Sequence, residues 1–107
     1  IMIKAKFNSQ KNLITGFTLS GHADSGEYGH DIVCAAVSVL SISTVNGLSQ
    51  VAGIKPMVDQ DEKNGGYLAV TIKDIDLDNI RVQALLLCFK NGISDIAKQY
   101  DQYIKVQ

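Results

Sequence analysis

A cysteine near the start of an apolar segment is the first residue in this sequence that could perform chemistry. Cys34 ends the run Asp31-Ile-Val-Cys34, in which Asp31 is a suitable N-cap for a helix. Cys34 would then take the third helical position, where free backbone N–H groups create a positive potential. Such a potential lowers the pKa of a thiol, and the same N–H groups can bind an oxyanion beside the sulfur. The position predicts a nucleophile, although a cysteine in an apolar helix is more often a core residue.

A histidine strengthens the prediction of a nucleophile. His22 directly follows a predicted strand and lies on the glycine-rich stretch 21–30, which must turn back to the helix start. A histidine within reach of such a thiolate gives the Cys–His arrangement of acyl transfer. His30 is the rival base, but we expect its side chain to point away from the third helical position. We therefore predict Cys34 as the nucleophile and His22 as the base.

Several polar residues surround this pair. Asp24, Glu27 and Asp31 favour a protonated histidine and oppose a thiolate, and a thiolate–imidazolium pair would reconcile the two effects. Ser38 follows Cys34 by one helical turn, so it can bond the sulfur or a substrate, or bond back to the carbonyl of Cys34. The second cysteine, Cys88, is expected in the core.

Metal and cofactor sites have little support. His22, Asp24, His30, Asp31 and Cys34 could supply ligands, but their spacing matches no standard zinc pattern. The glycines form neither a dinucleotide-binding fingerprint nor a phosphate-binding loop. We therefore expect neither a metal nor a cofactor.

The elements that must position these residues follow from the apolar periodicity. The order ββαββα predicts an α+β fold, with two helices packed on a four-stranded, mainly antiparallel sheet, in a single domain spanning residues 1–107. Pro56 favours an edge position for the third strand, and Asp76 or Asp78 can cap the last helix. The expected strands are 3–7, 13–20, 54–59 and 67–73, and the expected helices are 32–48, opened by Asp31, and 78–103.

Composition limits the classes of partner. The net charge is −1 and the ten basic residues are scattered, which argues against direct nucleic-acid binding. We expect no segment to reach the ~18 apolar residues of a membrane span. Two cysteines in unlike contexts fit the reducing cytoplasm. The 32–48 helix is apolar on nearly every face, so we expect a homodimer that covers part of it.

The assembled stretch GHADSGEYGHDIVCAAVSVLSI, residues 21–42, carries a resemblance. It is similar to the ribosomal-processing cysteine protease family, often called Prp, whose signature is G-H-A followed by Y-G-x-D-I-V-C-A-A-V-S. The matching positions are Gly21, His22, Ala23, Tyr28, Gly29, Asp31, Ile32, Val33, Cys34, Ala35, Ala36, Val37 and Ser38.

The resemblance implies a function as well as a site. Cys34 would be the nucleophile and His22 its partner, with Asp31 and Ser38 as supporting positions and His30 at the variable place of the motif. Members of the family are dimeric and occur in Gram-positive bacteria and their relatives. They remove a short N-terminal extension from large-subunit ribosomal protein twenty-seven, which would make that protein the substrate partner.

Two alternatives stay open at this point. The first is a non-catalytic, ribosome-associated binding module whose Cys and His are structural, and the second is a thiol redox sensor, which the lack of a resolving cysteine near Cys34 disfavours. For the protease we also expect a lid over bound peptide. It would be formed by the substrate loop from Gly21 to Gly29, with Tyr28 packing on the peptide.

Overall fold

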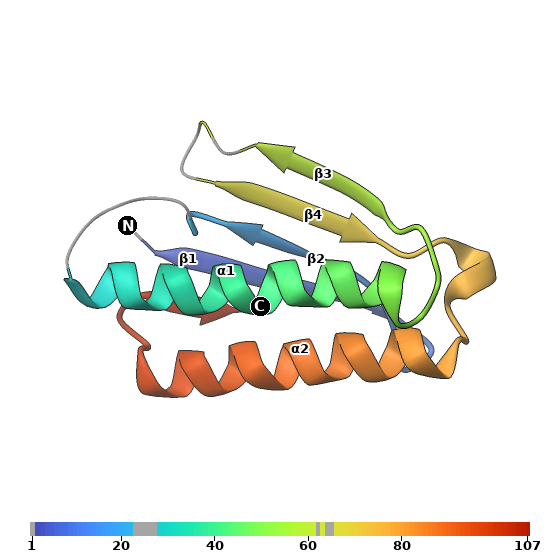
Figure 1. Cartoon of the computed structure of the whole chain (residues 1–107). Helices are drawn as coiled ribbons and strands as arrows, with labels where there is room; N and C mark the ends of the chain where they lie inside the picture. The colour runs from blue at the N-terminus through green and yellow to red at the C-terminus, as the bar shows by residue number, and fades with distance from the viewer. Residues whose placement is uncertain (1, 23–27, 62, 64–65) are drawn as a thin grey trace.

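Two long helices lie side by side against one face of a single sheet (Figure 1). The structure is a computed structural model, and it describes residues 2–22, 28–61, 63 and 66–107. The predicted α+β class is confirmed. In chain order the described elements are β1 (Ile3–Gln10), β2 (Leu13–Ser20), α1 (Tyr28–Gln50), β3 (Met57–Asp61), β4 (Tyr67–Thr71), the 3₁₀ turn η1 (Asp74–Asp76), α2 (Ile80–Gln99) and β5 (Ile104–Val106).

The sheet has one more strand in its described part than the sequence predicts. The strand order is β3-β4-β2-β1-β5, and all neighbours are antiparallel except β1 and β5, which run parallel. We expected the last helix to continue to residue 103, but α2 ends at Gln99. Ile104 instead pairs with Ile3, because the outer edge of β1 offers backbone groups that need partners.

The two predicted hairpins are both present. Lys11 and Asn12 join β1 to β2 with φ values of 53° and 67°, the positive pair that a tight two-residue turn requires. In the second hairpin, the strand expected at 54–59 begins later, at Met57. Pro56 has no N–H group for the ladder, so the strand starts after it. The predicted edge position of β3 is confirmed.

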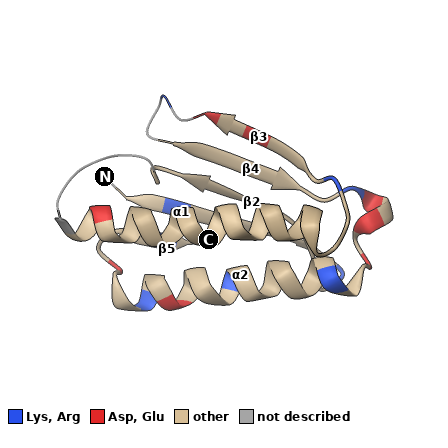
Figure 2. Cartoon of the chain, viewed as in Figure 1, with Lys and Arg blue, Asp and Glu red and all other residues tan. Residues whose placement is uncertain are grey.

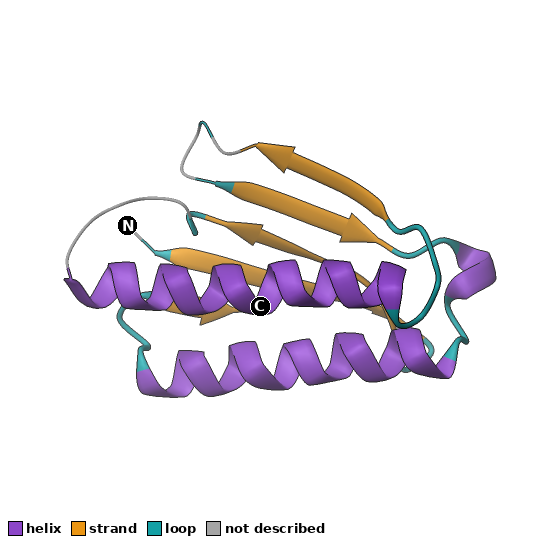
Figure 3. Ribbon diagram, in the orientation of Figure 1, coloured by secondary structure: helices purple, strands orange, loops and turns teal. Residues whose placement is uncertain are grey.

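Figure 3 shows the two helices against one face of the sheet, and the buried core residues come from both layers. Phe17 of β2 and Phe89 of α2 make a tilted ring contact, with centroids 4.5 Å apart. The expected periodicity of α2 is confirmed, since Val82, Leu86, Phe89 and Ile93 are all buried.

Two expectations for α2 are wrong. The helix is capped by Asn79, whose side chain accepts hydrogen bonds from the backbone N–H groups of Arg81 and Val82, and not by Asp76 or Asp78. Asn79 is the residue directly before the helix, where a side chain can reach the free N–H groups. Cys88 is exposed, because it faces away from the buried stripe of the helix.

Helix α1 is apolar on its outer side as well as its inner side. Asp31 is the one charged residue in the sequence from Tyr28 to Gln50. Figure 2 shows the rest of the described helix in tan, without Lys, Arg, Asp or Glu. By length and composition alone, Gly29–Gln50 could cross a membrane, so the expectation that no segment is long and apolar enough is wrong. The helix packs its inner face on the core, and a core helix has the same composition.

Gly16 is the glycine on which the sheet depends most. A Cβ atom there would collide with the backbone carbonyl oxygen of Val70 on the neighbouring strand β4. We expect Gly16→Ala to lower the free energy of unfolding by about 3 kcal/mol, the upper end of the usual cost of over-packing, because backbone cannot move aside. Denaturant unfolding measures this loss.

Gly92→Ala is the matched control. Its Cβ would lie 3.2 Å from the Cδ1 atom of Leu40, a side chain that can yield. The gain in helix propensity, roughly 1 kcal/mol, offsets that contact. Equal stability of the two variants would contradict the assigned pairing of β2 with β4.

Candidate active site

The predicted nucleophile lies further inside its helix than the sequence indicates. Helix α1 begins at Tyr28, so Asp31 lies in its first turn and does not cap it. Cys34 is consequently in the second turn, beyond the free N–H groups of the helix start. The expected third position and the oxyanion site beside it are therefore wrong for this structure, because the influence of a helix terminus fades within one turn.

Cys34 contacts His30, the histidine that we expected to point away. The Sγ atom lies 3.4 Å from Nδ1 of His30 and 3.9 Å from Nε2. Residues four apart share one face of a helix, and the early start of α1 places both side chains on that face. Both are buried, with exposed fractions of 4% for His30 and 9% for Cys34.

The ring of Tyr103 also contacts His30. Their ring centroids lie 6.1 Å apart at an angle of 71°, an edge-to-face contact. Gly29 makes room for this ring, because a Cβ atom there would lie 2.9 Å from the Tyr103 hydroxyl oxygen. Gly29 is therefore a residue of α1 that lies against the Tyr103 ring. The prediction that it belongs to a substrate loop is wrong for this structure.

The predicted base, His22, follows the end of β2. Gly21 turns the chain there with a φ of 79° and donates its N–H to the carbonyl of Gly66 at 3.0 Å. His22 is 6% exposed, and its Nδ1 atom has no hydrogen-bond partner among the described residues. In the same part of the chain, no hydrogen bond joins His22 to Cys34. A buried ring nitrogen without a partner costs roughly 1–3 kcal/mol, which calls for a functional reason.

A groove of about 330 Å³ runs between α1 and the β3–β4 side of the sheet. Ser38, one turn after Cys34, lies in its wall together with His22. The Ser38 hydroxyl makes no hydrogen bond to the described residues, so neither the bond to the Cys34 sulfur nor the bond back to the Cys34 carbonyl is formed. Ser41 and Thr44 do bond back to helix carbonyls. The lining residues are His22, Ser38, Ser41, Ile42, Val45, Asn46, Gln60 and Leu68.

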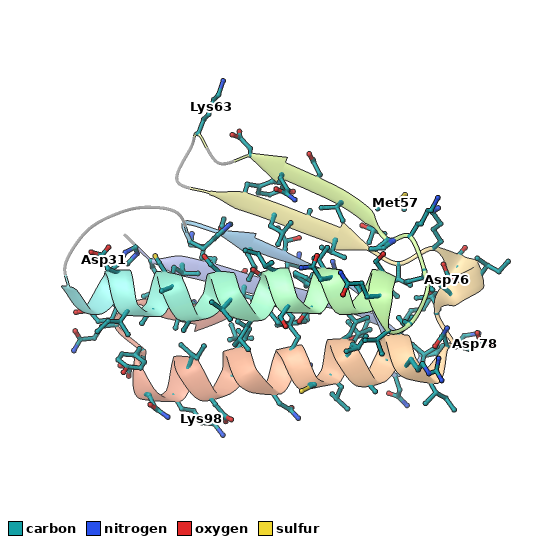
Figure 4. The ribbon with its side chains drawn as sticks, viewed as in Figure 1. Asp31, Met57, Lys63, Asp76, Asp78 and Lys98 are labelled. Carbon is teal, nitrogen blue, oxygen red and sulfur yellow. The ribbon has the colours of Figure 1, made fainter. Side chains whose placement is uncertain are left out.

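The remaining predicted residues are only partly described. Asp31 is exposed at the N-terminal end of α1 (Figure 4). The backbone of Tyr28 opens α1, so the expected irregular stretch ends before it. Asp24, Glu27 and most of the expected lid lie outside the described residues. Among the residues that are described, no group of three His, Cys, Asp or Glu side chains could hold a metal ion.

Sequence reasoning missed His30 and Tyr103 as neighbours of the thiol. The spacing of four between His30 and Cys34 would have indicated the first contact, had the helix been expected to start at Tyr28. Tyr103 is distant in sequence, and no local pattern indicates its place.

Comparison with known proteins gives a consistent result. A family model described as cysteine protease Prp matches residues 2–105. The ribosomal processing cysteine protease Prp of Staphylococcus aureus (strain Mu50 / ATCC 700699) is 33% identical over 93 residues, which cover 87% of this chain and 85% of that protein.

Solved structures agree with this match over nearly the whole chain. The crystal structure of SMU.848 from Streptococcus mutans is 38% identical, with a TM-score of 0.95, and the match covers 99% of this chain and 92% of that one. The S. aureus ribosomal processing protease Prp in complex with a substrate peptide is 27% identical, with a TM-score of 0.88 and coverages of 99% and 98%. A second structure of that protease, with a covalently linked product peptide, is 28% identical, with a TM-score of 0.79 and the same coverages.

Proposed function

The chain belongs to the family of the cysteine protease Prp, and we propose that it removes the N-terminal extension of large-subunit ribosomal protein twenty-seven during ribosome maturation in the cytoplasm. The processing role named for the S. aureus relative supports the ribosomal substrate. The substrate peptide held by the S. aureus enzyme supports a peptide as the ligand of the equivalent fold. The match to a family of cysteine proteases disfavours the two alternatives, a non-catalytic binding module and a redox sensor.

The observation that carries this proposal is a groove that Cys34 does not itself line but that lies one helical turn along α1 from it. It is lined by His22 and by Ser38, which is the residue one turn along α1 from the thiol. An extended peptide lying in the groove would pass close to Cys34 with His22 beside it. The exposed edge strand β3 borders the groove through Gln60, and such an edge can pair with an extended chain.

The proposed reaction proceeds through a thioester. The Cys34 sulfur attacks the carbonyl carbon of the scissile bond, a C–S bond forms and the C–N bond breaks. His22 takes the thiol proton and gives it to the leaving amine. Water, deprotonated by the same imidazole, then hydrolyses the thioester and restores the thiol. The covalently linked product peptide in the S. aureus enzyme supports a covalent intermediate here.

Mass spectrometry tests the proposed substrate. The purified chain is incubated with the ribosomal protein carrying its N-terminal extension, and both fragments are weighed. We expect one cut that releases the extension, and no cut with the mature protein lacking it. A substrate that stays intact with folded enzyme, when a separate sample of the same enzyme reacts with a thiol label at Cys34, would overturn the proposed function.

We also propose that the enzyme is a homodimer that covers the outer face of α1. Ile32 and Val39 on that face are 41% and 67% exposed, and no charge follows them along the helix. Apolar side chains repeated on one face are typical of an interface. We expect sedimentation at micromolar concentration to give a dimer, and Val39→Lys to shift it to monomer.

Leu87→Lys is the matched control for this prediction. Leu87 is 54% exposed on α2, a different helix from the one that carries the proposed interface. The variant should stay dimeric. A fully active wild-type monomer, or equal dissociation of both variants, would contradict the proposed interface.

A further inference from the structure

We propose that His30 is a second catalytic histidine, which holds the proton of Cys34 in the peptide-free enzyme. The proposal rests on the proposed function, because it takes Cys34 as the nucleophile. Its basis is the 3.4 Å contact between Nδ1 of His30 and the sulfur that would attack the substrate. Both side chains project from the same face of α1, so the helix itself fixes their spacing.

The surroundings of His30 are built to hold it in this place. The imidazole is 4% exposed, and the described groups that face it are the Cys34 thiol and the Tyr103 ring. Tyr103 is itself fixed by backbone bonds, since its carbonyl accepts from Ile3 at 2.8 Å and its N–H donates to Tyr100 at 2.9 Å. A buried imidazole needs a polar partner, and the thiol supplies one.

The proposed proton transfer is internal and balanced. The S–H proton of Cys34 passes to Nδ1 of His30, which leaves a thiolate beside an imidazolium, and each charge stabilises the other. When peptide is bound, the proton passes from Nδ1 of His30 back to the sulfur, and His22 takes it as the sulfur attacks and gives it to the leaving amine. His22 lines the groove, whereas neither His30 nor Cys34 is among its described lining residues. The two histidines would therefore act at different stages on the same thiol.

Alkylation of the peptide-free enzyme tests the role of His30. Wild type and His30→Asn react with iodoacetamide at neutral pH, and mass spectrometry follows the peptides that contain Cys34 and Cys88. Asparagine keeps a hydrogen-bonding group near the sulfur but cannot take up its proton. We expect alkylation of Cys34 to slow roughly tenfold, because a thiol without a basic partner is only a few per cent ionised. Exposed Cys88 is the internal control and should react equally in both proteins.

His22→Asn is the matched variant, and we expect it to leave Cys34 alkylation in the free enzyme unchanged. An unchanged rate in His30→Asn, or a loss in His22→Asn alone, would overturn the role of His30. Failure of the proposed function would be seen in a different assay, because wild type would then leave the extended ribosomal protein uncut whatever the alkylation rates.

A second measurement covers the case in which His30→Asn does not fold. The ultraviolet absorbance of a thiolate is compared between wild type and Cys34→Ser at neutral pH. Cys88 contributes equally to both proteins, so it cancels in the difference. We expect wild type to show the additional thiolate absorbance, and no difference between the two would refute the proposal.

Discussion

Replacing Cys34 by alanine should abolish peptide cleavage while the protein stays folded. The substitution removes the atom that would form the thioester, and loss of a protease nucleophile costs on the order of 10⁶-fold in rate. The thiol is small and 9% exposed, so its loss should cost on the order of 1 kcal/mol in the free energy of unfolding. Cleavage of the extended ribosomal protein and a thermal unfolding curve measure the two effects.

Cys88→Ala is the matched control for this substitution. Cys88 is exposed on α2 and has no role in the proposed reaction, so this variant should cleave like wild type. Cleavage retained by Cys34→Ala would exclude Cys34 as the nucleophile. Unfolding of Cys34→Ala would instead favour a structural cysteine.

Replacing His22 by alanine should lower kcat/KM by about 10²–10⁴-fold, the usual worth of general acid–base assistance. A group that protonates the leaving amine must reach the groove in which the peptide lies, and His22 lines that groove. Its Nδ1 atom has no partner among the described residues, so its removal breaks no hydrogen bond at that atom. We therefore expect a large loss of activity with little change in the thermal midpoint.

His30→Ala provides the comparison in the same assay. His30 contacts the thiol but is shielded by Tyr103, so we expect a smaller loss of cleavage than in His22→Ala. The opposite ranking would assign the base to His30. A loss of stability in His22→Ala would show that its imidazole has a structural role instead.

The two variants together separate chemistry from packing at this site. His22 and His30 are buried to a similar degree, with exposed fractions of 6% and 4%. Replacing either histidine by alanine therefore removes a similarly buried side chain. A difference in activity between the two variants then reports on the reaction. His30→Ala also removes the contact with Tyr103, so its thermal midpoint should fall more than that of His22→Ala.

Local patterns in the sequence predicted the elements whose residues interact with near neighbours. The hairpin at Lys11 and Asn12 depends on two adjacent residues that accept positive φ, and the buried stripe of α2 depends on helical spacing. Pro56 indicated the edge strand because proline has no backbone N–H group to donate to a neighbouring strand. Cys34 and His22 were recognisable through their residue types and the ordered motif around them.

The sequence by itself thus determined the α+β class, the family and the two residues to which the chemistry is assigned. Tertiary structure decided the rest. The segment Ile104–Val106 forms a strand because the outer edge of β1 was free to pair with it. The groove forms because α1 does not cover β3. The pairing of Cys34 with His30 needed the helix to start at Tyr28, and the ring of Tyr103 reached that pair from the far end of the chain. Such contacts depend on packing between distant segments, which no local pattern encodes.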